Sequence, residues 1–312
     1  MTGGFSMRPA TAAQEQPLLG GDAQIDLNAD EAAAQARAVL AEFDTETIGL
    51  TAVKRRLAEI AALLLVSRAR ARFGLSASSP SLHMSFTGGP GTGKTTVALR
   101  IAELLHGLGY LRTPRVVAVT RDDLVGQFIG HTAPKTKEAI ARAAGGVLFI
   151  DEAYYLHRPE NERDYGQEAV EILLQEMESG RGSLVVVFAG YEDRMEKFLS
   201  SNPGLSSRVA HHIRFDDYGH DELVRIAELM LARDSYRFTP EARAAFEAYV
   251  ELRMAMPRFA NARSIRNALE RCRLRQAIRL AALGGPLGLA ELTDLTATDV
   301  RGSSVFAQAV EP

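Results

Sequence analysis

Cysteine, tryptophan and lysine are scarce in this chain of 312 residues. It has one cysteine, Cys272, and no tryptophan. A single cysteine cannot form an intramolecular disulfide or a cysteine-based metal site, which excludes disulfide-stapled and zinc-finger-like proteins and fits a reducing compartment. Only five of the 36 lysine and arginine residues are lysine. Positive charge therefore comes almost entirely from arginine, so a lysine inside a motif is notable.

Long hydrophobic runs and a charge excess are also missing. The longest apolar stretch, IAALLLV at 60–66, is far shorter than the ~20 residues of a membrane-spanning helix. A net charge of −3 leaves no basic excess to neutralise nucleic-acid phosphates, and the local basic clusters are interpreted as solvated helix faces. The chain does not open on a signal sequence. We therefore expect a cytoplasmic protein that binds no membrane and no nucleic acid.

Short apolar runs and helical patterns alternate along the first two thirds of the chain. Runs typical of buried strands occur at 83–88, 116–120, 146–151, 184–190 and 211–215. Helical segments near 94–107, 134–144 and 165–179 lie between them. Nearly continuous apolar strands that alternate with helices predict a parallel sheet covered on both faces. The sequence thus predicts a doubly wound α/β domain with five strands.

The remainder of the chain has a different character. After about residue 218 the strand-like runs stop, and helical patterns cover 220–233, 239–254 and 261–283. Thr239-Pro240 and Asn261 are typical of helix starts. Residues 1–30 are small, polar and aperiodic, which indicates a mobile tail. We therefore expect three parts: a tail over 1–30, an α/β domain over 31–217 and a small all-helical domain over 218–312.

A glycine-rich stretch, SFTGGPGTGKTTVALRI at 85–101, follows the first apolar run. It matches G-x-x-x-x-G-K-[ST], the Walker A pattern, in which backbone N–H groups and a helix N-terminus surround phosphate oxygens. The lysine would reach the β- and γ-phosphates, and the first threonine would ligate Mg²⁺. A chance match is improbable because lysine is so rare here. The predicted nucleotide-binding residues are Gly88, Pro90, Gly91, Thr92, Gly93, Lys94, Thr95 and Thr96.

Two acids, Asp151 and Glu152, end the apolar run GVLFIDE. The carboxyl end of a strand is where ligands bind in open α/β sheets. Asp151 would hold Mg²⁺ together with Thr95, and Glu152 would orient the attacking water. The alternative is that both acids only cap the helix that follows. The phosphate loop makes the catalytic interpretation the better one, and the chain is expected to be an ATPase.

Seven ordered segments resemble the CbxX/CfxQ family of AAA+ ATPases, a family that includes the red-type Rubisco activases. They are IGL, HMSFTGGPGTGKTTVA, RDDLVGQFIGHTAPKTKE, GGVLFIDEAYYL, DYGQEAVEILL, NPGLSSRVAHHIRF and FANARSIRNAL. The likeness spans about residues 42 to 305. It implies an AAA+ nucleotide-binding domain followed by a helical lid.

The resemblance also assigns roles that the residues alone leave open. Arg208 would act as an arginine finger on the ATP of a neighbouring subunit, and Arg263 would contact phosphate in its own subunit. Judged by composition alone, either arginine is more often an ordinary surface ion-pair residue in so arginine-rich a chain, and it is the resemblance that favours the phosphate roles. Ile48 and Gly49 would border the adenine, although they could be a simple helix lead-in. The chain departs from the AAA+ pattern at FAGYEDR, where many relatives place Asn, Ser or Thr.

The segment VGQFIGHT carries Phe128, Ile129 and Gly130 in succession. In hexameric AAA+ rings, a loop with an aromatic residue lines the central pore and grips the substrate polypeptide. A single phenylalanine is more often buried in a core, so burial is the alternative. The resemblance favours the pore loop.

The resemblance implies a cofactor, an effector and a partner. ATP and Mg²⁺ would be bound, with ribulose 1,5-bisphosphate as an allosteric effector. The expected client is red-type Rubisco. A homohexameric ring would pull the C-terminal tail of its large subunit in order to release tight-binding sugar phosphates. Two alternatives stay open. The chain could be an ATPase of the same family that acts on another client, or a non-enzymatic scaffold whose assembly is controlled by nucleotide binding.

Overall fold

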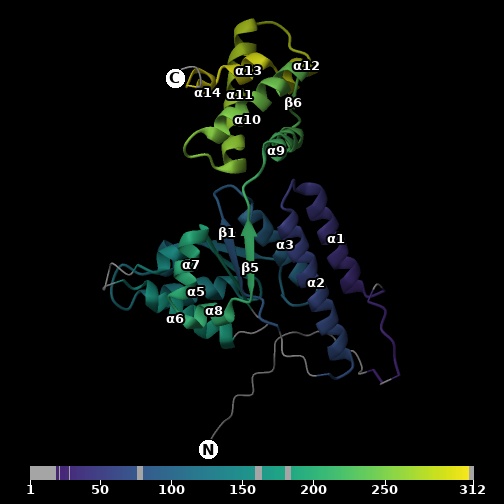
Figure 1. Cartoon of the computed structure of the whole chain (residues 1–312), viewed down its shortest axis with the longest axis vertical. Helices are drawn as coiled ribbons and strands as arrows, with labels where there is room; N and C mark the ends of the chain where they lie inside the picture. The colour runs from purple at the N-terminus through teal and green to yellow at the C-terminus, as the bar shows by residue number, and fades with distance from the viewer. Residues whose placement is uncertain are drawn as a thin grey trace, which may run out of the picture. The chain divides into compact units, whose positions relative to one another are not determined.

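The computed structural model describes residues 19–20, 22–27, 29–75, 80–158, 164–179 and 184–308 (Figure 1). Most of the predicted tail, namely residues 1–18, 21 and 28, lies outside this described part. The chain divides into two compact units. The N-terminal unit comprises 1–46, 50–88 and 94–215, and the C-terminal unit comprises 47–49, 89–93 and 216–312.

A five-stranded parallel sheet forms the centre of the N-terminal unit, with the order β2-β3-β4-β1-β5. The strands are β1 (Met84–Gly88), β2 (Val116–Val119), β3 (Val147–Ile150), β4 (Val185–Gly190) and β5 (His211–Phe215). In β1, Met84 is in register with Val187 of β4 and with His211 of β5. The predicted parallel sheet and its five strands are confirmed.

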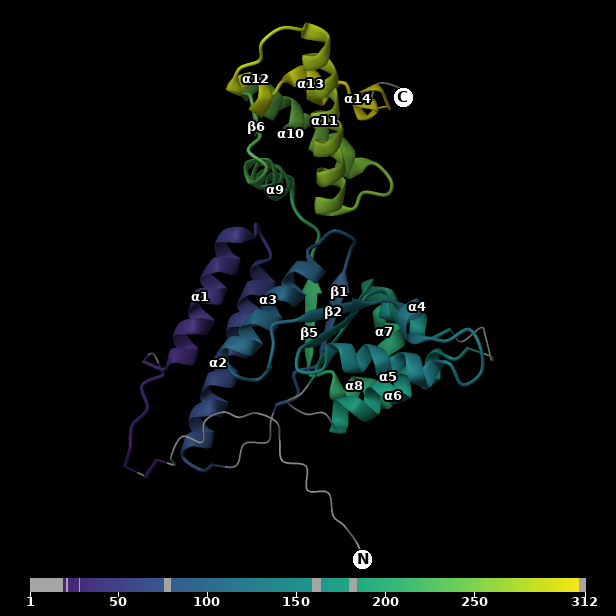
Figure 2. The same ribbon diagram turned by 180° about the vertical axis from the view of Figure 1, so that it is seen from behind.

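Helices cover both faces of this sheet (Figures 1 and 2). One face packs against α2 (Thr51–Arg72) and α3 (Lys94–Gly107), and α1 (Glu31–Glu46) packs on these two helices. The other packs against α4 (Arg121–Leu124), α5 (Thr132–Ala143), the 3₁₀ turn η1 (Ala153–Leu156), α6 (Gly166–Ser179), α7 (Glu192–Ser200) and α8 (Pro203–Arg208).

Strand β3 shows why the pattern of the sequence was continuous rather than alternating. Val147 and Phe149 belong to the core on one face, whereas Leu148 and Ile150 belong to the core on the other. Because successive side chains of a strand point to opposite faces, a strand buried on both sides must be apolar at every position. The doubly wound prediction is confirmed on this ground.

Helices make up most of the C-terminal unit, as predicted. They are α9 (His220–Arg233), α10 (Pro240–Ala255), α11 (Asn261–Leu283), α12 (Leu289–Thr293), α13 (Ala297–Arg301) and α14 (Ser304–Gln308). Thr239 caps α10, because its hydroxyl accepts a hydrogen bond from Ala242 N at 3.2 Å. One small addition was not foreseen: β6 (Arg237–Phe238) pairs in parallel with β7 (Asp294–Leu295).

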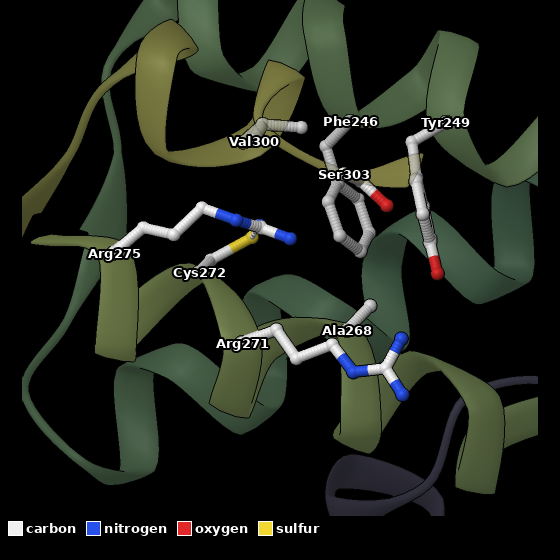
Figure 3. Close-up of a pocket in the computed structure, with 8 residues that line it drawn as sticks. All are labelled: Phe246, Tyr249, Ala268, Arg271, Cys272, Arg275, Val300 and Ser303. Atoms are coloured by element: carbon white, nitrogen blue, oxygen red, sulfur yellow. Dashed lines mark hydrogen bonds between the residues drawn. The ribbon is translucent and has the colours of Figure 1, made fainter. Parts of the chain in front are cut away.

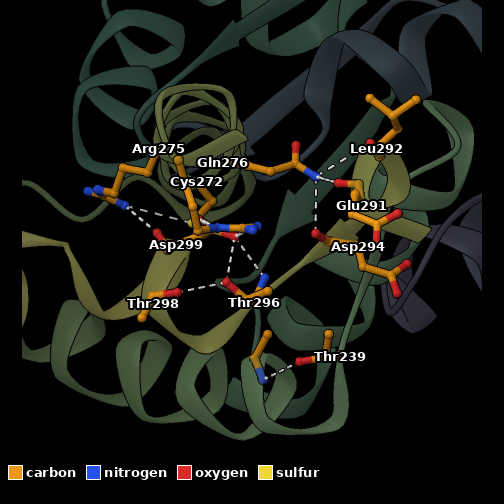
Figure 4. Close-up of polar contacts among 12 residues, drawn as sticks. Thr239, Cys272, Arg275, Gln276, Glu291, Leu292, Asp294, Thr296, Thr298 and Asp299 are labelled. Carbon is orange, nitrogen blue, oxygen red and sulfur yellow. Dashed lines mark hydrogen bonds and ion pairs between the residues drawn. The ribbon is translucent and has the colours of Figure 1, made fainter. Parts of the chain in front are cut away.

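Buried polar side chains tie the end of the chain to α11 (Figure 4). The Gln276 amide donates to the carbonyl oxygens of Glu291 and Asp294, each at 3.0 Å. Arg279 donates to both carboxylate oxygens of Asp299, at 3.0 and 2.9 Å. Asp299 also accepts from Thr296 N at 2.8 Å, which caps α13. The unit is therefore held by specific polar bonds as well as by apolar packing.

Candidate functional site

The carboxyl ends of the five parallel strands lie at one edge of the sheet, and predicted chemical residues directly follow β1 and β3. Strand β1 ends at Gly88, β3 at Ile150 and β4 at Gly190. At Gly88, a Cβ atom would lie 2.3 Å from the carbonyl oxygen of Phe215. Only glycine allows this close approach of β1 to β5 just before the phosphate loop.

Residues 89–93 of the phosphate loop group with the C-terminal unit, and their contacts there are specific. The Thr92 hydroxyl donates to Gly89 O at 2.9 Å, and the Tyr218 hydroxyl donates to Thr92 O at 3.2 Å. Gly91 has a φ of 73°, and a Cβ there would lie 2.2 Å from Ala260 O. The loop conformation therefore depends on a glycine at this position.

Asn261 binds the phosphate loop, a role that the sequence did not predict. Its side chain is 2% exposed. Its Nδ2 donates to Pro90 O at 3.3 Å and to Asp217 Oδ1 at 2.7 Å, while its Oδ1 accepts from Tyr218 N at 3.0 Å. Helix α11 begins at Asn261, which confirms the predicted helix start, and its N-cap residue is Ala260. The Asn261 amide is committed to the phosphate loop.

Arg263 lies against the same loop. Its backbone N would be 2.8 Å from a Cβ on Gly91, and its own Cβ 3.1 Å. Arg263 is exposed. Gly49, with a φ of 64°, is close to Tyr218, because a Cβ there would lie 3.3 Å from Tyr218 Cε1. Tyr218 thus contacts both the 48–49 segment, where Ile48 is half-buried, and the phosphate loop.

Lys94 opens α3 in the N-terminal unit, directly after the loop. Its Nζ donates to Gly88 O at 3.0 Å. Thr95 and Thr96 follow in the first helical turn and are exposed. The lysine ammonium and the threonine hydroxyls are therefore at the helix N-terminus, where the unpaired N–H groups favour an anion.

Asp151 and Glu152 come immediately after β3. Asp151 N continues the sheet by donating to Val119 O at 2.8 Å, and Asp151 Oδ1 accepts from Glu152 N at 3.1 Å. Glu152 has left-handed backbone angles, φ 50° and ψ 44°. Such a conformation is strained for a residue other than glycine and occurs often at functional sites. The Glu152 side chain is exposed, and its Oε1 accepts from the Tyr154 hydroxyl at 3.1 Å.

The donor atoms offered by Thr95 and Asp151 fit Mg²⁺, which prefers hard oxygen ligands and keeps several waters. The described part of the chain contains no cluster of three or more His, Cys, Asp or Glu residues able to hold a metal ion. An ion here would therefore complete its shell with nucleotide phosphates and water, as Mg²⁺ does in other nucleotide sites.

Arg208 lies at the end of α8 and forms an ion pair with Glu178 of α6. The guanidinium also donates to Gly204 O at 3.3 Å. Its side chain is 29% exposed, and that of Glu178 is 63% exposed. The structure thus holds Arg208 near the surface with a partner from its own chain.

The segment 125–131 connects α4 to α5 and carries the predicted pore-loop residues. Phe128 is 64% exposed and Ile129 is 83% exposed, so the alternative that Phe128 is buried in a core does not hold in this chain. Gly130 has a φ of 81°, and a Cβ added there would have no neighbour within 4 Å among the described residues. At the base of the loop, Gly126 N donates to the Thr132 hydroxyl at 3.0 Å.

A separate pocket in the C-terminal unit contains none of the predicted site residues (Figure 3). It is lined by Phe246, Tyr249, Ala268, Arg271, Cys272, Arg275, Val300 and Ser303. Burial raises the pKa of the Cys272 thiol to about 11. A thiol that stays protonated at neutral pH is a poor nucleophile, which argues against a nucleophilic role for Cys272.

Two protein-family models match consecutive parts of the chain. Residues 84–217 match the family described as ATPase family associated with various cellular activities (AAA), and residues 219–308 match the AAA lid domain. The AAA domain of FIGL-1 in complex with ADP superposes with a TM-score of 0.56 at 16% identity, covering 85% of this chain and 83% of that one. At that identity the superposition supports the fold alone. Among the described residues, no helix is both long and apolar enough to cross a bilayer.

Several curated relatives are similar over nearly their whole length. Protein CbbX of Cereibacter sphaeroides is 62% identical over 90% of this chain and 92% of its own. Protein CbxX (plasmid) of Cupriavidus necator is 60% identical over 96% of each chain. The chloroplastic ribulose bisphosphate carboxylase/oxygenase activase of Cyanidioschyzon merolae is 56% identical over 90% of this chain and 97% of its own.

Proposed function

Because this chain belongs to the CbbX/CbxX/CfxQ family of AAA ATPases, we propose that it uses ATP to remodel inhibited red-type Rubisco. It releases tight-binding sugar phosphates by pulling the C-terminal tail of the large subunit into the pore of a homohexameric ring. The observation that carries this proposal is the 56% identity, over 283 residues, to a protein named as a Rubisco activase.

The proposed nucleotide site combines the phosphate loop with residues at the strand ends. Backbone N–H groups of residues 88–93, Pro90 excepted, surround the phosphates, and Lys94 adds its ammonium. Thr95 and Asp151 hold Mg²⁺, which when bound neutralises charge on the β- and γ-phosphates. Ile48 and Gly49 border the base. The shared contact of Tyr218 with Gly49 and Thr92 supports this grouping.

Glu152 orients the attacking water in this proposal, and Arg263 contacts phosphate from the N-terminal turn of α11. Its backbone already lies against Gly91 of the phosphate loop. Arg208 reaches the ATP of a neighbouring subunit. Its pair with Glu178 is compatible with this role, because an ion pair to a largely exposed carboxylate contributes only about 0–1 kcal/mol and can be exchanged for a phosphate.

The exposed loop 125–131 provides the grip on the client. An aromatic and a β-branched side chain at its tip offer apolar contact that tolerates many peptide sequences. A Cβ added at Gly130 would meet none of the described residues, and the Phe128 ring contacts His131 of the same loop, with 5.5 Å between the ring centroids. A large apolar tip exposed to solvent is unfavourable in an isolated chain, and such exposure often marks an interaction site.

The decisive experiment measures ATP hydrolysis and Rubisco reactivation together. ATPase activity is assayed with and without ribulose 1,5-bisphosphate, and then with red-type Rubisco inhibited by a tight-binding sugar phosphate. We expect the bisphosphate to stimulate hydrolysis, and Rubisco activity to return only when ATP is present. Hydrolysis without any reactivation would indicate another client. A complete lack of hydrolysis, with or without effector, would favour the nucleotide-gated scaffold.

A matched pair of variants tests the loop. Phe128→Ala is expected to keep ATP hydrolysis and to lose reactivation, because the ring that grips the peptide is gone. Phe128→Tyr keeps the ring and is expected to keep both activities. Full reactivation by Phe128→Ala contradicts the proposed pore loop while leaving the ATPase site untouched.

A further inference from the structure

The end of strand β4 has no polar side chain, and the structure shows what occupies the space instead. β4 ends at Gly190, where a Cβ atom would lie 2.7 Å from Cδ1 and 2.8 Å from Cε1 of the Tyr154 ring. It would also lie 3.0 Å from Cγ of Met195. Real Cβ contacts are not this short, so any larger residue at 190 would displace the ring. The glycine therefore creates the room in which Tyr154 lies.

The ring of Tyr154 is fixed on several sides. Its side chain belongs to the core of this face of the sheet and is 6% exposed. Its centroid is 4.7 Å from that of Tyr155 and 6.1 Å from that of Tyr191. The guanidinium of Arg194 lies 5.1 Å from the centroid. A ring confined in this way presents its hydroxyl in one direction.

That hydroxyl points at the proposed catalytic carboxylate. It donates to Glu152 Oε1 at 3.1 Å, across a 3₁₀ turn in which Glu152 is the N-cap residue. Burial, the charge of Glu152 and the hydrogen bond to Glu152 raise the pKa of Tyr154. The hydroxyl consequently remains a donor throughout the neutral range. Oε1 accepts from the tyrosine, and no described residue forms a hydrogen bond with Oε2, which can therefore accept from a water.

We propose that Tyr154 is a positioning residue for ATP hydrolysis: its hydroxyl orients the Glu152 carboxylate, and Gly190 is required to admit its ring. The inference rests on the proposed role of Glu152 in orienting water. A tyrosine that only filled space would work equally well as phenylalanine, because phenylalanine keeps the ring and its contacts with Tyr155 and Tyr191. The hydroxyl is thus the group to test.

The first experiment removes that hydroxyl alone. Tyr154→Phe is expected to lower kcat for ATP hydrolysis about tenfold, with KM for ATP within about twofold of the unchanged protein and the melting temperature unaltered. The matched control is Tyr155→Phe, which removes a hydroxyl from the adjacent, 38% exposed tyrosine and is expected to keep full activity. An unchanged kcat in Tyr154→Phe overturns the proposal.

A double variant tests whether the tyrosine acts through Glu152. Single-turnover hydrolysis is measured for Glu152→Gln with and without Tyr154→Phe. If the hydroxyl works by orienting the carboxylate, the second change costs less than about twofold once Glu152 is gone, because interacting residues are not additive. A further tenfold loss contradicts the proposal.

The same set separates this inference from the proposed site. If Glu152→Gln still hydrolyses ATP at the normal rate, the assignment of Glu152 fails and the inference fails with it. If Glu152→Gln is inactive and Tyr154→Phe is fully active, the site assignment stands and only the inference fails. Nucleotide binding, followed with a fluorescent ADP analogue, is expected to be equal in all of these variants.

Discussion

The interior of the N-terminal unit and that of the C-terminal unit are stabilised by different kinds of interaction. In the N-terminal unit, the central strands β3 and β4 are apolar on both faces, and every one of their residues is buried. In the C-terminal unit, two buried polar side chains, Gln276 and Asp299, connect α11 to the last segments of the chain. The first arrangement depends on shape and area, whereas the second depends on particular atoms finding particular partners.

This difference has a consequence for where chemistry is placed. The two-sided apolar sheet gives Asp151 and Glu152 a rigid support, because close-packed cores resist displacement. The residues that hold the phosphate loop in the C-terminal unit, Asn261 and Tyr218, do so by hydrogen bonds. Each such bond contributes only about 1 kcal/mol net. A loop held in this way is compatible with rearrangement when a phosphate offers competing bonds.

The largest expected effect removes chemistry from the N-terminal unit without disturbing its packing. Glu152→Gln is expected to lower kcat about 10³-fold, within the usual range for loss of a general base, while nucleotide binding and the melting temperature are kept. Steady-state ATPase assays and a thermal melt check this. Glu138→Gln, an exposed change on α5, serves as the control and is expected to have no effect.

The next effect concerns the buried thiol of the C-terminal unit. Because the pKa of Cys272 is raised to about 11, its thiolate is about 10²-fold rarer at neutral pH than that of an ordinary cysteine. Labelling by a thiol reagent is expected to be slower by at least that factor than in the protein unfolded by urea. Labelling at the rate of a free thiol would contradict the burial of this residue.

The polar ties of the C-terminal unit are tested by Asp299→Ala. The carboxylate is 2% exposed and bound by Arg279, so its removal leaves a partly buried guanidinium without its partner and is expected to cost about 3 kcal/mol. Hydrogen exchange should show faster opening of α11 and α13, with the sheet unaffected, and Cys272 labelling should accelerate. Asp221→Ala, at a side chain 97% exposed, is the control. Equal opening of both units would contradict a stabilising role of Asp299 that is confined to the C-terminal unit.

The smallest effect is a dependence on pH. Burial by itself raises the pKa of Asp299, but the hydrogen bonds from Arg279 and Thr296 outweigh it, and the net result is a pKa below the ordinary 3.8. A lowered pKa in the folded state means that Asp299 contributes stability above pH 3.8, which is lost as the pH falls through the folded value. The C-terminal unit should therefore become easier to unfold with urea between pH 6 and pH 3, and less so in Asp299→Asn.

The fold could be predicted from the sequence where the signal is local and repeated. Nearly continuous apolar runs and glycines before Lys94 are patterns of neighbouring residues, and they predicted the sheet and the phosphate loop. The two-residue pairing of β6 with β7 joins positions 57 residues apart, as the Arg237–Asp294 bond shows. Nothing near either strand signals it.

Contacts within the candidate site could not be predicted either, because most of them join residues that are far apart in the sequence. Asn261 was interpreted as a helix start because asparagine favours that position, yet its amide binds Pro90, 171 residues away. The pairing of Arg208 with Glu178 joins α8 to α6 across 30 residues. Tyr154 and Glu152 are only two residues apart, but their contact requires the left-handed angles of Glu152. No sequence pattern announces those angles in a residue other than glycine.

The loop 125–131 can also be considered as a mechanical part. Its base is closed by the hydrogen bond from Gly126 to Thr132, and a Cβ on Gly126 would lie 2.5 Å from that of His131. The part of the loop that extends beyond this hydrogen bond is therefore only a few residues long. Because the loop is this short, a force applied to Phe128 is transmitted almost directly to the first turn of α5. A large displacement of the loop tip then requires movement of α4 and α5, the helices at its base.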